Sequence, residues 1–295
     1  MNMNRDPETI HSAGVTRAPR ARKRGFSVWG AAWRLALCII LFLTFFPFFF
    51  LVATSLKDTH QFYHTFWLPA WPPAWQNYHQ AFADLKIYIF NSIFVTAVSI
   101  SGIVASSTLT GFLFARYRFP GREVIYYLML AMLMVPGVLM LIPQFLWVQQ
   151  LGLLNTYSVM ILPSIAGMQV MGMFLLRGFF AQIDQALFES AQVDGAGLFR
   201  QLWHIGLPLS KPILGVVAIM SALGVWNSFL WPLVTTSDED VMVLTVGMLR
   251  YNGRVLGQYG PMFAGYVISA IPLGVLFTLF TRAFMKGITS GALKA

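Results

Sequence analysis

The chain contains few charged residues and a single cysteine. Of its 295 residues only 11% are charged and 57% are hydrophobic, and the mean hydropathy is +0.65. A soluble domain of this length carries about 25% charged residues, so the composition excludes an ordinary soluble protein and indicates an integral membrane protein. The lone Cys38 cannot form a disulfide within the chain.

Motifs that would mark an enzyme or a cofactor site are also missing from the sequence. There is no GxxxxGK[ST] loop to hold the phosphates of ATP, no HExxH, no GxSxG and no Cys/His cluster with metal-ligand spacing. We therefore expect no catalytic residue, no metal site and no cofactor bound by this chain. If ATP and Mg²⁺ drive the protein, a separate chain must use them.

Six runs without Asp, Glu, Lys or Arg could each cross a lipid bilayer. A helix that spans the hydrocarbon needs about 20 residues, and the runs have 22, 28, 25, 20, 23 and 21. Backbone polar groups in lipid must be paired within their own segment, so each run should be a helix. We predict an all-α integral membrane protein with one transmembrane domain over residues 31–295. Its six transmembrane helices cover residues 35–56, 87–114, 124–148, 157–176, 212–234 and 261–281.

Small residues and a proline mark two of these runs. Small side chains recur every three or four positions in the second span and form a stripe that lets another helix approach closely. That stripe consists of Ser99, Gly102, Ser106 and Thr110. The third span contains Pro136 followed by Gly137. A proline within a helix removes a backbone donor and bends it, so we expect the strongest kink here.

The formal charge of +9 is distributed unevenly along the chain. Sixteen of the twenty Lys and Arg residues fall in the N-terminal arm, the second and fourth interspan loops and the tail, whereas the alternate loops hold four. This positive-inside pattern predicts that both termini lie in the cytoplasm. It also explains the basic charge without a nucleic-acid partner. Residues 1–30 are expected to be a basic, disordered cytoplasmic arm that could touch anionic lipid.

The spans hold none of the ionisable groups that proton-coupled carriers usually keep within the membrane. Their absence argues against a proton-driven carrier, although coupling to Na⁺ through backbone carbonyls stays open. Three functions therefore remain. The chain is part of a transporter whose energy comes from a partner, an ATP-independent secondary carrier or channel for small polar solutes, or a membrane scaffold with no transport role.

The longest predicted cytoplasmic loop, residues 177–211, has coherent local signals. Asp184 can cap a helix at its start, and Gly195 and Gly197 can end it, because glycine accepts the left-handed conformation. A second helical stretch is expected over 198–204. The residues alone leave two interpretations open: a rigid element that docks on a partner, or an amphipathic loop on the inner membrane surface.

The loop contains Glu189, Ala191, Asp194, Gly195 and Ala196, followed by Ile205, Leu207, Pro208 and Pro212. This pattern resembles the EAA signature of the permease subunits of ABC importers. The stretches 115–122, 134–137, 151–157, 226–232 and 287–292 are similar to the sugar branch of that family, especially to the second maltose-transport permease. Ser190 replaces the usual second alanine, and Asp184 stands where the family usually has proline.

The resemblance implies a type I ABC importer permease in the inner membrane of a bacterium, with a heterodimeric sister permease, two ATP-binding subunits and an extracytoplasmic solute-binding protein. The partner ATPase would use ATP and Mg²⁺, and the substrate would be a sugar. The residues implied as the contact with the ATPase are Glu189, Ser190, Ala191, Asp194, Gly195, Ala196 and Leu198.

Three polar or aromatic residues at membrane depth are candidates for the substrate pathway: Asn91, Trp226 and Asn227. Buried polar groups in a membrane need partners, so they face other helices or a cavity. An amide beside an aromatic ring suits a sugar, which offers both hydroxyls and C–H faces. Hydrogen bonding from helix to helix explains these residues equally well.

Overall fold

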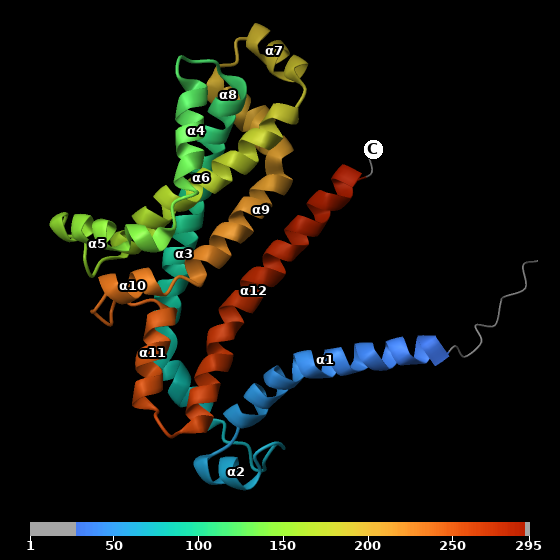
Figure 1. Ribbon diagram of the computed structural model, residues 1–295, viewed down its shortest axis with the longest axis vertical. Helices are drawn as coiled ribbons and strands as arrows, with labels where there is room; N and C mark the ends of the chain where they lie inside the picture. The colour runs from blue at the N-terminus through green and yellow to red at the C-terminus, as the bar shows by residue number, and fades with distance from the viewer. Residues whose placement is uncertain (1–27, 293–295) are drawn as a thin grey trace, which may run out of the picture. The chain divides into compact units, whose positions relative to one another are not determined.

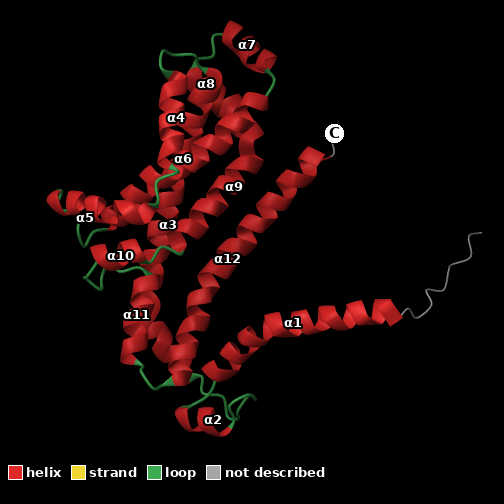
Figure 2. Ribbon diagram, in the orientation of Figure 1, coloured by secondary structure: helices red, strands yellow, loops and turns green. Residues whose placement is uncertain are grey.

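The computed structural model describes residues 28–292, with side chains as far as Thr278. Figure 2 shows helices joined by loops and turns throughout this range, and no strand occurs in it. The described residues fall into two compact units that divide between Pro47 and Phe48. Residues 1–27 of the expected arm lie outside the described residues, so their disorder stays a prediction, whereas residues 28–30 already belong to the first helix and were wrongly placed in the arm.

The helices are long near the core and short in the connections (Figure 1). In chain order they are α1 (Val28–Ser55), α2 (Thr59–His64), α3 (Gln76–Arg116), α4 (Arg122–Met132), α5 (Leu141–Gln150), α6 (Tyr157–Gln182), α7 (Gln185–Val193), α8 (Leu198–Gln201), α9 (Leu207–Trp226), α10 (Leu230–Thr235), α11 (Leu244–Arg254) and α12 (Tyr259–Ala292). A 3₁₀ turn, Gly137–Met140, precedes α5, and a π-helical turn, Leu202–Gly206, joins α8 to α9.

Five segments of the described chain are long and apolar enough to cross a membrane: residues 32–55, 76–116, 157–182, 198–226 and 259–278. A sixth span arises if α4 and the segment 137–150 are counted as one. The all-α, multi-span architecture predicted from the sequence is thus confirmed. Most spans run beyond the predicted limits, because a helix continues into polar residues outside the apolar run.

Helix α3 forms the centre of the second unit. Its 41 residues span about 60 Å at 1.5 Å per residue, more than the hydrocarbon thickness of about 30 Å. It packs against α6, α9 and α12, and its fully buried residues include Leu85, Ile103 and Phe112. The loop between α6 and α8 lies near one end of α3, and α11 lies near the other end (Figure 1).

The predicted stripe of small residues is only partly the contact surface of α3. Gly102 faces Ile165 of α6, as expected, and Ser107 and Gly111, which lie outside the predicted stripe, also approach α6 closely. Ser106 and Thr110 instead donate their hydroxyls to carbonyls of their own helix. The α6 contact of α3 therefore combines Gly102 of the predicted stripe with Ser107 and Gly111 beside it.

The third predicted span, 124–148, is not one helix. α4 ends at Met132, and the axis turns by 94° before the segment Gly137–Gln150. The turn occurs at the predicted position, because Pro136 has a ψ of 125°, far from helical, and disfavours helical geometry in the residue before it. The expected kink is thus a complete interruption.

The fifth predicted span, 212–234, is wrong at both ends. The helical segment begins at Leu198 and ends at Trp226, and α10 is a separate short helix. Its start is early because the π-helical turn accommodates Pro208, which lacks the N–H that an α-helix would need there. α6 also continues to Gln182, so the loop predicted over 177–211 shortens to residues 183–197.

Candidate functional site: the α6–α8 loop and the groove beside α10

The loop between α6 and α8 has the predicted helix–turn–helix form. The carboxylate of Asp184 accepts a hydrogen bond of 3.0 Å from the N–H of Ala186 and caps the start of α7. Residue Gly195, just beyond α7, has a φ of +78°, where glycine has no steric penalty. Its N–H and that of Ala196 donate back to α7, the latter to Ala191 at 2.8 Å. This pair of bonds is a Schellman ending, which satisfies the last carbonyls of the helix.

A second side-chain hydrogen bond holds the end of the turn that leads into α8. The side-chain amide of Gln201 is buried and donates to the carbonyl of Ala196 at 2.7 Å. Gly197 is extended and leads directly into α8. Since both ends of the turn are hydrogen-bonded, residues 194–197 form a rigid corner.

The predicted contact residues lie on this corner and along α7. Glu189, Ser190, Asp194 and Gly195 are exposed, and the remaining three, Ala191, Ala196 and Leu198, are half-buried. The structure thus brings all seven onto one protruding element. Whether they contact an ATPase stays a prediction.

Large apolar side chains surround these residues and were not singled out from the sequence. The exposed fractions of Val193, Phe199 and Trp203 are 89%, 72% and 70%. Their signal in the sequence is apolar residues directly beside the charged ones in a polar loop. An exposed surface that combines carboxylates with large apolar groups is typical of a binding surface.

One buried ring attaches α7 to the rest of the molecule. Phe188 is the buried residue of α7, and its ring centroid lies 5.7 Å from that of Phe112 in α3. The guanidinium of Arg116 stands 4.3 Å from the centre of the Phe188 ring. Sequence reasoning missed both Phe188 and Arg116.

Two of the three predicted pathway residues have hydrogen-bond partners within the chain, and the third is buried. The Asn91 amide donates to the carbonyls of Asp240 and Met242 at 2.8 and 2.9 Å, and its oxygen accepts a bond from the Tyr157 hydroxyl. The Asn227 amide donates to the carbonyl of Leu223 at the end of α9. Trp226 is 7% exposed. The structure therefore joins Asn91 to the loop before α11, and the pathway role of all three stays a prediction.

A groove of about 480 Å³ lies between the 3₁₀ turn and α5, α6, the end of α9 and α10. It exists because the chain turns sharply at Pro136, which places α5 beside α10. Its polar side chains are Gln144, Ser164 and Ser228, and its aromatic ones are Phe229 and Trp231. A groove of this size with a few polar groups suits a small organic ligand. Sequence reasoning missed Gln144 and Ser228, because neither lies in a charged or glycine-rich motif.

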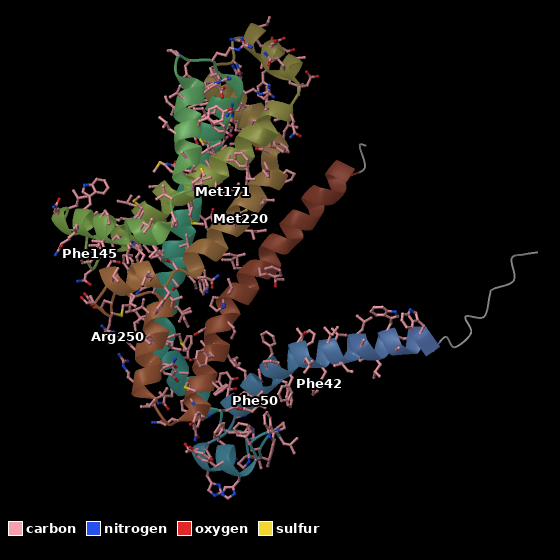
Figure 3. The ribbon with its side chains drawn as sticks, viewed as in Figure 1. Phe42, Phe50, Phe145, Met171, Met220 and Arg250 are labelled. Atoms are coloured by element: carbon pink, nitrogen blue, oxygen red, sulfur yellow. The ribbon has the colours of Figure 1, made fainter. Side chains whose placement is uncertain are left out.

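A second hollow is smaller and apolar. Met171 of α6 and Met220 of α9, both labelled in Figure 3, line about 250 Å³ of space together with Leu133. This lining offers hardly any hydrogen-bonding groups, so it suits another apolar surface better than a polar solute. Within the described residues, no three His, Cys, Asp or Glu side chains are grouped so that they could hold a metal ion.

Comparisons with known proteins extend over nearly the whole chain. Residues 107–290 match the family described as binding-protein-dependent transport system inner membrane component. The diacetylchitobiose uptake system permease protein NgcG of Streptomyces coelicolor is 31% identical over 284 residues, which cover 95% of this chain and 93% of the relative. The arabinooligosaccharides transport system permease protein AraQ of Halalkalibacterium halodurans is 29% identical over 271 residues, covering 89% and 96%.

The fold is also similar to that of a solved structure. A chain of a bacterial ABC transporter involved in the import of the acidic polysaccharide alginate matches with a TM-score of 0.73 and 20% identity, over 87% of this chain and 96% of that chain. The family match over residues 107–290, together with the apolar helices, identifies a multi-pass membrane subunit of a transporter and not an enzyme. The chain belongs to the family of inner membrane components of binding-protein-dependent transport systems.

Proposed function

We propose that this chain forms one half of the translocation pathway of an ATP-driven sugar importer and couples to a separate ATPase through residues 184–198. The observation that carries the proposal is the similarity to sugar-uptake permeases over 95% of the chain, combined with a rigid, exposed corner at the EAA-like residues. The two relatives described above are named for the uptake of diacetylchitobiose and arabinooligosaccharides.

The chemistry of the α7 corner favours a protein partner over a membrane surface. Glu189 and Asp194 are exposed carboxylates on the same short element as the exposed Val193. Anionic headgroups of the inner leaflet attract basic segments and not acidic ones. A groove on an ATPase can instead cover the apolar side chains and pair the carboxylates, which makes the corner a docking element.

The partners follow from this role. Both termini of the chain lie in the cytoplasm. Two ATP-binding subunits also lie there, and they use ATP and Mg²⁺. A sister permease completes the pathway as a heterodimer within the lipid bilayer, and an extracytoplasmic solute-binding protein delivers the sugar. Closure of the ATPases moves the α7 corners, and the spans then open alternately to each side. No nucleic acid takes part.

A neutral sugar fits the polar lining of the groove beside α10. Its described lining contains the amide of Gln144 and the hydroxyl of Ser228 beside the Trp231 ring, and it contains no Lys or Arg. Hydroxyl groups of a sugar can bond to the amide and hydroxyl, while its C–H faces lie against the ring. A phosphate ester would need cationic contacts, which the sister subunit would have to supply. Asn91, Trp226 and Asn227 remain the pathway residues predicted from the sequence.

Gentle detergent extraction of the tagged chain, followed by mass spectrometry of the co-purifying proteins, tests the assignment. We expect a P-loop ATPase and a second multi-span permease, and we expect Gly195→Asp to remove the ATPase while the chain stays in the membrane. Gly197→Asp places the same charge two residues away, where φ is −70°, and separates the effect of charge from that of the turn. A stable homo-oligomer without an ATPase would favour the ATP-independent carrier instead.

A further inference from the structure

Helix α7 is connected to its neighbours by very short segments. Two residues, Ile183 and Asp184, separate it from α6, and the turn 194–197 separates it from α8. These connections hold the two ends of α7, so the side chains that pack against the helix decide how firmly its orientation to α3 and α6 is set. A force applied to exposed residues of α7 moves the spans only if those contacts hold.

The Phe188 ring supplies one such contact. It is buried and packs against Phe112 of α3, and Phe112 packs in turn against Phe180 of α6 with a centroid distance of 5.4 Å. The three rings thus join α7, α3 and α6 in one cluster. Rings packed at these distances resist displacement, because the interior around them is close-packed.

Arg116, the last residue of α3, also contacts this cluster. Its guanidinium lies over the Phe188 ring and donates to the carbonyls of Phe180 and Ile183, at the last turn of α6. The carboxylate of Asp184, which caps α7, also acts electrostatically on Arg116. One side chain therefore contacts the end of α6, the connection to α7 and the buried ring of α7.

Arginine suits this position better than any other cation. The carbonyls at a helix C-terminus carry partial negative charge, and the planar guanidinium offers several donors in a fixed arrangement while its face stacks on an aromatic ring. Both bonds come from one nitrogen, Nη2, so a lysine ammonium could donate to the same carbonyls, but it has no planar face to stack on the Phe188 ring at the same time.

We propose that Arg116 is a positioning residue that holds α7 at a set orientation to α3 and α6, so that a displacement of α7 by the ATPase moves the spans. This inference rests on the proposed function, in which α7 is the ATPase contact. Loss of Arg116 then uncouples hydrolysis from transport without releasing the ATPase, because the exposed docking residues of α7 are unchanged.

The coupling ratio tests the proposal directly. The complex with its ATPase is reconstituted in proteoliposomes, and the solute imported per ATP hydrolysed is measured for Arg116→Gln, Arg116→Lys and Arg118→Gln. Arg118 is exposed in the same loop and controls for the loss of one cytoplasmic charge. We expect a severalfold fall in the ratio for Arg116→Gln, a smaller fall for Arg116→Lys and none for Arg118→Gln. A purely structural role would lower the amount of complex but leave the ratio unchanged, and that result would overturn the proposal.

Spin labels test the orientation of α7 without an ATPase. Labels on Val193→Cys in α7 and Val124→Cys in α4, both exposed positions, are introduced together with Cys38→Ser in the full chain. We expect a narrow distance distribution that broadens with Arg116→Gln, whereas an equally narrow distribution would contradict the proposal. If the unaltered chain retains no ATPase, the proposed function fails, but this measurement still decides the role of Arg116.

Discussion

Gly172 of α6 lies so close to Ser107 of α3 that a Cβ on the glycine would stand 2.3 Å from the serine hydroxyl oxygen. The same hydroxyl donates to the carbonyl of Gln169, 3.1 Å away. The contact between the two most central helices therefore depends on the absence of a side chain at residue 172. A bulkier residue must push the helices apart and break this hydrogen bond.

Gly172→Ala should consequently destabilise the protein. Overpacking of a close contact costs about 1–3 kcal/mol, which should lower the melting temperature of the purified protein in detergent. Gly167→Ala is the matched control on the same helix, because a Cβ there meets no atom within 4 Å. Equal melting temperatures for the two variants would show that the α3–α6 contact yields more easily than the structure implies.

The left-handed turn at Gly195 predicts a graded series of substitutions. In this conformation a residue with a side chain is destabilised by about 1–2 kcal/mol, which changes an equilibrium constant by a factor of about 5–30. Asparagine is destabilised less than alanine. ATPase retention in pull-downs should therefore fall in the order Gly195, Gly195→Asn, Gly195→Ala. Gly197→Ala should behave as the unaltered chain, since its φ is −70°. The idea fails if Gly195→Ala retains the ATPase fully.

Asn91→Ala should destabilise the loop before α11. The substitution removes the donor to the buried carbonyl of Met242 and to that of Asp240, and leaving such groups unpaired costs about 1–3 kcal/mol. Faster proteolysis within residues 236–243 would report the loss. Serine at residue 92 holds the same loop through the N–H of Leu244, so Ser92→Ala should give a similar effect. If Asn91→Ala changes solute preference at unchanged stability, Asn91 is a substrate contact instead.

The groove beside α10 predicts a change in substrate affinity. Gln144→Leu keeps the volume but removes the amide, and a lost hydrogen bond of about 0.5–1.5 kcal/mol should raise KM by up to about tenfold. Gln149→Leu on the exposed part of α5 is the control. Asn227→Ala tests the pathway residue predicted from the sequence in the same uptake assay. Unchanged KM and solute preference in both Gln144→Leu and Asn227→Ala would exclude the groove and Asn227 from the pathway.

Glu239 should make the loop before α11 sensitive to acid. Hydrogen bonds from Arg254 and then Arg250, labelled in Figure 3, hold the pKa of Glu239 below its ordinary value, although partial desolvation opposes them. The carboxylate thus stabilises the fold fully above about pH 4.3, the ordinary pKa of Glu, and this contribution disappears as the pH falls through the lowered pKa.

Melting curves of the unaltered chain and Glu239→Gln at several pH values check this sign. The two melting temperatures should differ at about pH 6, and the difference should shrink as the pH falls through the lowered pKa of Glu239, because its carboxyl group then becomes neutral like the glutamine amide. A difference that persists at the lower pH would mean that the variant acts through something other than the charge.

Local sequence was enough to predict the helices and the α7 corner. The apolar runs exceed the length of a membrane crossing, and backbone pairing in lipid leaves helices as the solution. The cap at Asp184 and the turn at Gly195 act within a few residues of themselves, so the helix–turn–helix was also predictable. The extension of the fifth span to Leu198 was not, because the π-helical turn that accepts Pro208 does not follow from hydropathy.

The contacts that give the candidate site its shape are long-range. Asn91 donates a hydrogen bond to the carbonyl of Met242, which lies 151 positions away in the chain. Arg116 donates to the carbonyl of Ile183, which lies 67 positions away. No periodicity links such residues. The sequence by itself determined the class of protein, its helices and the corner that carries the EAA-like residues, because these follow from composition and short-range bonding. Only the tertiary structure decided where α7 is anchored, where the groove opens and what Asn91 binds, because side chains from distant segments meet only when the helices pack.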